Sequence, residues 1–230
     1  MVYTRTIGEK TLTFIVSGKL WRNSLIMQDK ETKSLWSHVT GEAIDGSMKG
    51  ERLEFIPSVQ TTWSDWVKQH PGTKLLHKEK AVRSSAYQDY FNDPDRIGIF
   101  RTRRLIEQMP AKSLIHGIIH GPHALAVSDD RLTSNQPLNV LLGSDPFVVV
   151  RTRDGGVRAY HARSGDLKLH FIRTAEPSQI EDKETGSIWN LDKGECIDGR
   201  CKGASLEEEV VRTAFWFAWS NFYPNTRVEK

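Results

Sequence analysis

The chain contains the stretch DKETKSLWSHVTGEAIDGSMKG at residues 29–50 and the stretch DKETGSIWNLDKGECIDGRCKG at residues 182–203. The second stretch begins 153 residues after the first, and the same offset relates the tryptophan pairs Trp36/Trp189, Trp63/Trp216 and Trp66/Trp219. Tryptophan is a rare residue, so three tryptophan pairs in one register are very hard to obtain by chance. Self-similarity at a fixed spacing is typical of internal duplication, and the sequence therefore predicts two copies of one structural unit.

The two copies are not equally complete. Upstream of residue 29 the offset becomes 157, which pairs Tyr3 with Tyr160. Residues 115–159 of the second copy then have no counterpart, because their partners would lie before Met1. We therefore expect a first repeat that lacks its N-terminal third, a polar connector and a complete second repeat. These three parts are residues 1–77, 78–113 and 114–230.

Short β-branched and aromatic runs between turn residues predict a mainly β (α+β) fold for both copies. The sequence Asp-Lys-Glu-Thr at 29–32 reads as a hairpin turn, because an aspartate at the first position can accept hydrogen bonds from the turn's own backbone. Gly186 ends this turn in the second copy, where a left-handed conformation is often needed. The first copy has Lys33 at that position, so we expect strain or a different geometry there.

Each copy is expected to end in one short aromatic helix, the two copies being related by a pseudo-twofold. Thr62 and Asp65 have the spacing of a capping box, and Thr213 is the expected cap in the second copy. Tryptophans at helical spacing more often form a core stripe than a ligand platform. The expected structural residues are Trp36, Trp63, Trp66, Trp189, Trp216, Trp219 and the turn glycines Gly41, Gly46, Gly194 and Gly199.

The composition is that of a soluble globular protein, with 38% hydrophobic residues, 27% charged residues and a net charge of +3. Arg101, Arg103 and Arg104 have no aromatic stacking platform beside them, so they indicate a solvated face and argue against a nucleic-acid partner. The apolar stretches are far shorter than the roughly 20 residues that a membrane helix needs. The first residues have no apolar core of a signal peptide, and we expect none in this chain.

Several of these motifs also resemble the family named domain of unknown function 3179. They are LTFIVSGKL at 12–20, the stretch at 29–50, TWSDWVKQHPGT at 62–73 and AFWFAWSNFYPNT at 214–226. The resemblance covers nearly the whole chain and implies a shared fold, but no established activity. It also implies an extracytoplasmic location as one option if the N-terminus is missing.

The resemblance further implies a His-Glu pair and a Cys-Pro-x-Cys segment ahead of the position of Met1, which would suit a metal or thiol site. Neither is present here, and the equivalent strand end of the second copy reads Arg-Thr-Arg-Asp at 151–154. No functional residue is therefore carried over from the family. The chain is expected to be an N-terminally truncated or short member.

Two groups of residues could carry chemistry. His116, His120 and His123 could hold a transition metal together with His161 or His170, because strand positions four apart share a face; a histidine-decorated hairpin is the alternative. Cys196 and Cys201 could form a disulfide across their loop or remain two free thiols. The sequence requires no cofactor, and no catalytic set can be assembled from it.

The leading hypothesis is a non-catalytic binding or assembly module. The chain has the residues expected of the scaffold, whereas the expected catalytic residues are absent from its sequence. The alternative is a metal- or thiol-dependent enzyme whose His-Glu and Cys-Pro-x-Cys site lies in a missing N-terminal segment. Whether the chain is an enzyme stays open at this point. An incomplete first repeat also leaves a sheet edge uncovered, which predicts a homo-oligomer or a partner protein at that edge.

Overall fold

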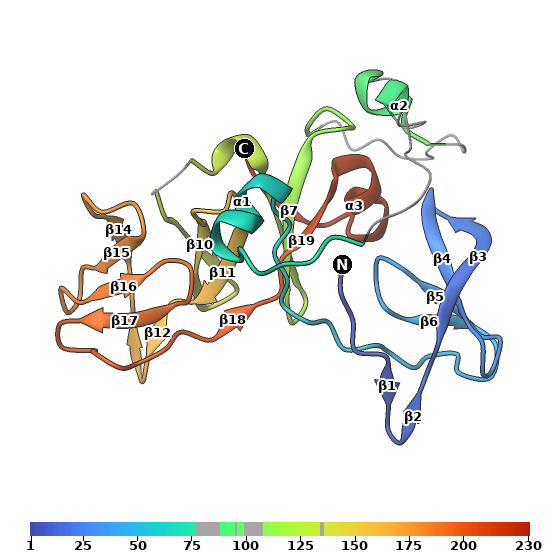
Figure 1. Cartoon of the computed structure of the whole chain (residues 1–230), viewed down its shortest axis with the longest axis horizontal. Helices are drawn as coiled ribbons and strands as arrows, with labels where there is room; N and C mark the ends of the chain where they lie inside the picture. The colour runs from blue at the N-terminus through green and yellow to red at the C-terminus, as the bar shows by residue number, and fades with distance from the viewer. Residues whose placement is uncertain (77–87, 95, 99–107, 134–135) are drawn as a thin grey trace.

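The computed structural model describes residues 1–76, 88–94, 96–98, 108–133 and 136–230. These residues form twenty short strands and three short α-helices, which confirms the mainly β class (Figure 1). Much of the predicted connector, including Arg101, Arg103 and Arg104, lies outside the described residues. Its described part contains the short helix α2 (Gln88–Asn92). None of the described helices is long and apolar enough to cross a membrane.

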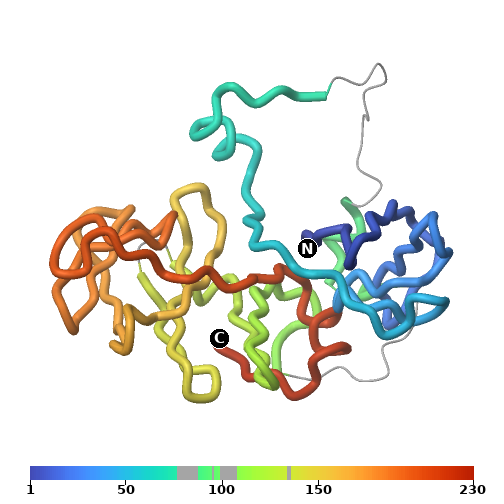
Figure 2. The backbone as a smooth tube through the Cα atoms, turned by 90° about the horizontal axis from the view of Figure 1, so that it is seen from below, coloured from blue at the N-terminus to red at the C-terminus, as the bar shows by residue number. Residues whose placement is uncertain are grey.

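Two four-stranded antiparallel sheets come from the two copies of the repeated stretch and have the same strand order. Phe14 pairs with Asp29 in the first sheet, as Phe171 pairs with Asp182 in the second. The sheets lie toward opposite ends of the molecule (Figures 1 and 2). Their strands are β3 (Phe14–Trp21), β4 (Ser24–Asp29), β5 (Leu35–Ser37) and β6 (Ala43–Asp45), and β14 (Phe171–Arg173), β15 (Gln179–Asp182), β16 (Ile188–Asn190) and β17 (Glu195–Asp198).

Each of these sheets is built around one buried tryptophan that donates to one buried aspartate. Trp36 Nε1 lies 2.9 Å from Asp29 Oδ2, and Trp189 Nε1 lies 2.8 Å from Asp182 Oδ2. Both aspartates also accept hydrogen bonds from the backbone of their own turn, as expected. A two-stranded hairpin accompanies each sheet, β1 (Thr6–Ile7) with β2 (Lys10–Thr11) and β12 (Arg163–Ser164) with β13 (Leu167–Lys168).

The part of the second copy that has no counterpart supplies the strands β7 to β10 of two further sheets. One has the order β19-β7-β8-β20 and the other the order β18-β11-β10-β9. Apolar residues of both sheets, among them Ile118 and Phe147, form one buried cluster. The strands are β7 (Leu114–His120), β8 (His123–Ser128), β19 (Arg212–Phe215) and β20 (Arg227–Glu229), and β9 (Leu138–Leu142), β10 (Asp145–Arg151), β11 (Val157–His161) and β18 (Glu208–Glu209), with the 3-10 turn η1 (Asp129–Arg131) after β8.

The two aromatic helices have different caps. Helix α1 (Trp63–Gln69) has Thr62 as its N-cap, whose side chain accepts from the Asp65 backbone, and this confirms the prediction. Helix α3 (Trp216–Phe222) has Phe215 as its N-cap, so the prediction of Thr213 is wrong. Thr213 is held in β19 by pairing with β7, and the first N–H groups of α3 donate to the backbone carbonyls of Ser113 and Ala111 instead.

The two helices also differ in burial. Trp216 and Trp219 of α3 are buried, whereas Trp63 and Trp66 of α1 are 52% and 39% exposed. The expectation that all four belong to a core is therefore wrong for α1. The physical reason is that α3 packs on β7 and β8, which come from the segment without a counterpart in the first copy.

Candidate functional site

In the second copy, residues 212–229 enclose the β7–β8 hairpin on three sides. β19 pairs with β7 in antiparallel orientation, β20 pairs with β8 in parallel orientation, and α3 contacts the sheet between them. Trp216 and Trp219 pack there against Ile115 and Ala126. We call residues 212–229 the clamp, because they hold the β7–β8 hairpin of the same chain.

The clamp requires a glycine in the hairpin that it holds. The ring of Trp219 lies directly on Gly117, and a Cβ at that position would come within 2.2 Å of the ring. Such a distance lies well inside the 3.5–4.0 Å at which carbon atoms make favourable contact. Any side chain on Gly117 would thus push the helix away from the sheet.

The first copy has an equivalent clamp in residues 59–76, which we call the arm. Within the arm, Trp66 Nε1 donates to Thr73 Oγ1 at 2.9 Å, as Trp219 Nε1 donates to Thr226 Oγ1 at 3.1 Å. The ring of Trp66 lies 4.0 Å from that of His70, and the ring of Trp219 lies 4.3 Å from that of Tyr223. The arm thus has the internal geometry of a clamp that is holding its hairpin.

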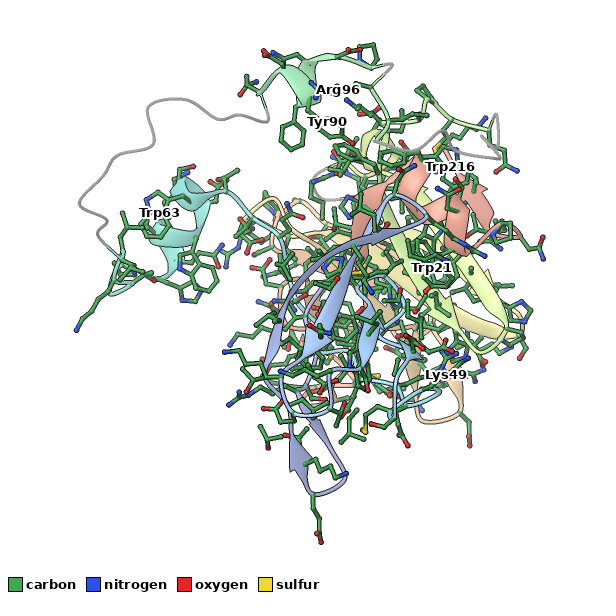
Figure 3. The ribbon with its side chains drawn as sticks, turned by 90° about the vertical axis from the view of Figure 1, so that its right-hand side faces the viewer. Trp21, Lys49, Trp63, Tyr90, Arg96 and Trp216 are labelled. Atoms are coloured by element: carbon green, nitrogen blue, oxygen red, sulfur yellow. The ribbon has the colours of Figure 1, made fainter. Side chains whose placement is uncertain are left out.

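Unlike the clamp, the arm holds no hairpin among the residues that the structure describes. It extends away from the sheets in Figure 2, and Figure 3 shows Trp63 well apart from the body of the molecule. Leu75 and Leu76, which occupy the positions of Val228 and Glu229 of β20, are 75% and 83% exposed. The base of the arm is anchored, because Thr61 Oγ1 donates to the carbonyl of Asp154.

The structure does not bring the three predicted histidines together. His116 is buried, with its ring nitrogens 2.7 Å from Asp129 Oδ1 and 3.2 Å from Thr213 Oγ1. Burial lowers the pKa of His116, against the raising effect of Asp129. His123 lies beside Gly143. These two histidines therefore belong to separate surroundings.

His120 has a different set of neighbours, namely His161 and Glu209. His161 was expected as an additional ligand, but Glu209 was missed. The sequence carries no signal for it, because the pairing of β11 with β18 joins positions about fifty residues apart.

The cysteines and the turn glycines have structural surroundings. Cys196 and Cys201 are free thiols in the structure, and Cys196 is buried. Burial raises the pKa of the Cys196 thiol. Gly41 and Gly194 both have a φ of +69°, and a Cβ on either would strike the ring of Tyr3 or Tyr160. A Cβ on Gly46 would strike Ser34, and a Cβ on Gly199 would strike Ser187.

The fold is that of a mainly β protein with two sheets of the same strand order and one short aromatic helix in each copy of the repeated sequence. The chain belongs to the family described as Protein of unknown function (DUF3179), which it matches over residues 1–226. It matches no curated protein and no solved structure.

Proposed function

We propose that the protein is a non-catalytic binding or assembly module, and that its arm accepts a β-hairpin from a partner protein. The observation that carries this proposal is the relationship between the two clamps. Trp66 and Trp219 have the same hydrogen bond and an equivalent ring contact, but within the described part of the chain only Trp219 has a hairpin beneath it. The arm is thus preorganised, which reduces the conformational entropy that is lost on binding.

The clamp formed by residues 212–229 is our template for the chemistry of the proposed partner. The hairpin has a glycine that faces Trp66, as Gly117 faces Trp219, and small or β-branched apolar residues beside it, as Ile115 and Ala126 provide. One of its strands pairs in antiparallel orientation with residues 59–62, and the other pairs in parallel orientation with residues 74–76. Main-chain hydrogen bonds would supply affinity, and the pocket over the glycine would supply specificity.

As far as the described residues show, a second copy of this chain does not offer such a hairpin. Its β7–β8 hairpin is covered on one face by α3, through the cluster of Ile115 and Ala126. On the other face Ile118 and Leu125 belong to the buried cluster shared with Phe147 of the neighbouring sheet. Release of this hairpin would expose both clusters, so we commit to a hairpin carried by a different polypeptide.

The thiol-dependent enzyme draws no support from Cys196. A reactive thiol needs a lowered pKa and some exposure, whereas Cys196 is buried and its pKa is raised by that burial. Cys196 therefore offers no reactive thiol, and the alternative still rests on a His-Glu and Cys-Pro-x-Cys site outside this chain.

The proposal is tested with a cyclised peptide that carries residues 113–128 of this chain as a model hairpin. Titration is followed by tryptophan emission, which shifts to the blue when Trp63 and Trp66 leave water. The matched control is the same peptide with Gly117→Leu. The expected preference for the glycine peptide is about 5- to 150-fold, because one blocked close contact of this kind costs about 1–3 kcal/mol.

The arm is tested separately with the protein variant Trp66→Ala, which should lose the binding. Thr62 and the rest of the α1 sequence are unchanged in this variant, so a loss reports on the docking face. Equal binding of the two peptides, or unchanged binding by Trp66→Ala, would overturn the proposal.

A further inference from the structure

Three side chains from three separate strands converge beside the β18–β11 pairing. His120 ends β7, His161 ends β11 and Glu209 ends β18. Glu209 Oε2 lies 3.5 Å from His120 Nδ1 and 3.5 Å from His161 Nε2. One ligand atom from each of the three residues lies within 4.8 Å of the other two.

These distances are close to those of a metal site. Zinc bonds to histidine nitrogen and carboxylate oxygen at about 2.0–2.1 Å, so neighbouring donors in a tetrahedron lie about 3.3 Å apart. The two distances from Glu209 are near that value without any ion. Only small side-chain movements are needed to bring His120 and His161 around one centre.

His120 is also oriented as metal-binding histidines usually are. Its Nε2 lies 3.1 Å from Asp145 Oδ2, and Asp145 Oδ1 accepts from Arg163 at 2.9 Å. A carboxylate that accepts the proton of one ring nitrogen leaves the other nitrogen free to bind a metal. Because Asp145 contacts Nε2, the nitrogen left free is the Nδ1 that faces Glu209.

The rings are held by packing as well. The ring centroid of Phe147 lies 5.0 Å from that of His120 and 4.4 Å from that of His161. All three ligand residues are only partly buried, so the site can be reached from solvent.

The fold itself does not require these residues. The first copy forms the equivalent antiparallel bridge between Tyr3 and Phe55, as the second copy does between Tyr160 and Glu208. Thr4 and Ile56 occupy there the positions of His161 and Glu209. A bridge of this kind thus folds with an uncharged pair, so His161 and Glu209 are not needed for the bridge itself.

We propose that His120 Nδ1, His161 Nε2 and the Glu209 carboxylate bind one divalent transition-metal ion, with Zn²⁺ as the best fit. Two imidazoles and one carboxylate suit zinc and the neighbouring late first-row metals. Three protein ligands leave one position of a tetrahedral ion for water or for an exogenous ligand. No residue of the arm takes part, so this site stands or falls independently of the hairpin proposal.

The test uses the full chain after treatment with a chelator and dialysis. Zn²⁺ is titrated against a chromophoric competitor, and metal content is measured by mass spectrometry after removal of unbound ion. The wild-type chain should bind one equivalent. Co²⁺ in place of Zn²⁺ should give the visible absorption bands of a low-symmetry site with nitrogen and oxygen ligands.

The decisive variant is His161→Thr combined with Glu209→Ile, which installs the residues of the first copy at the equivalent positions. Because that pair already supports the same bridge, the variant should keep its fold by circular dichroism and lose the metal. Asp145→Asn should weaken binding by about 10–100-fold, as expected for a residue that orients a ligand. His123→Ala is the matched control and should bind as the wild type does.

A well-folded wild-type chain that takes up no zinc would overturn the proposal. Equal affinity in the wild type and the double variant would overturn it as well, and so would a loss in His123→Ala as large as that in the double variant.

Discussion

Trp66 and Trp219 each donate a hydrogen bond to the threonine seven residues further on, although Trp219 is fully buried and Trp66 is 39% exposed. The helix that follows each cap also ends in the same way, with the backbone N–H of His70 or Tyr223 donating to the tryptophan carbonyl. The local sequence therefore sets the shape of the helix and its following turn, and docking adds burial to a shape that already exists.

This difference in burial predicts unequal costs for the same substitution. Trp219→Ala should lower the free energy of unfolding by about 3–5 kcal/mol, because it leaves a cavity over Gly117. Trp66→Ala should cost less than about 1 kcal/mol, since surface substitutions have small effects. Urea denaturation followed by circular dichroism measures both. Similar costs for the two variants would contradict the idea that only α3 is docked.

The turn that begins at Asp29 and its equivalent at Asp182 predict a stabilising substitution. Lys33 has a φ of +62°, and Gly186 at the equivalent position has a φ of +67°. The left-handed conformation costs a residue with a Cβ about 1–2 kcal/mol, and glycine gives back part of that through its larger entropy in the unfolded chain. Lys33→Gly should therefore raise the free energy of unfolding by about 0.5–1 kcal/mol.

The reciprocal variant Gly186→Lys serves as the control and should lower the free energy of unfolding by a comparable or larger amount. Thermal unfolding of the two variants beside the wild type compares them directly. A lower midpoint for Lys33→Gly would contradict the prediction. It would mean that the lysine side chain stabilises the fold by more than its left-handed backbone destabilises it.

Asp29 predicts a loss of stability in acid. Burial raises the pKa of its carboxyl group, but hydrogen bonds donated by Trp36 and Thr32 outweigh this effect and leave the pKa below its ordinary value. A carboxyl group with a lowered pKa in the folded state stabilises the fold above its unfolded pKa of about 3.9. That contribution is lost as the pH falls through the folded pKa.

The variant Asp29→Asn tests this prediction, because it cannot titrate. Below about pH 4 the free energy of unfolding of the wild type should fall more steeply than that of the variant. The two chains should show parallel curves between neutral pH and that point. Parallel curves throughout the acid range would mean that the lowered pKa does not contribute to stability.

The two thiols should react at different rates. Cys196 is buried and its pKa is raised by burial, whereas Cys201 is partly exposed. Since the thiolate is the reactive form, iodoacetamide should modify Cys201 well before Cys196 in the folded chain. Mass spectrometry of time points measures the order, and urea-unfolded protein should show nearly equal rates. Faster labelling of Cys196 would contradict the placement of this residue in the core.

Local signals in the sequence predicted those features that are themselves local. The aspartate turns and the Thr62 cap each depend on residues within a few positions of one another. For Lys33 the sequence left strain or a different geometry open, and the structure shows the strained left-handed conformation. Periodicity likewise identified the apolar face of α1. Periodicity could not tell whether such a face is covered. In the second copy the strands that cover α3, β7 and β8, lie about a hundred residues earlier in the chain.

The same limit explains the errors. Thr213 resembles a cap in sequence, but the carbonyls of Ser113 and Ala111 supply the acceptors at the start of α3. His116 and His120 were grouped by their spacing, whereas each lies beside a different carboxylate. Glu209 joins His161 only through a strand pairing that no local pattern marks. The repeat boundaries and the pseudo-twofold relation stay predictions.

The parallel pairing of β20 with β8 determines when the second copy can finish folding during synthesis. The last strand, Arg227–Glu229, closes a sheet whose first two strands, β7 and β8, leave the ribosome about a hundred residues earlier. The first sheet, by contrast, pairs only neighbouring strands and can form as soon as it emerges. Distant contacts slow folding because a long loop must close first. The nascent chain therefore carries a β7–β8 hairpin without its two flanking strands until β19 and β20 have emerged from the ribosome.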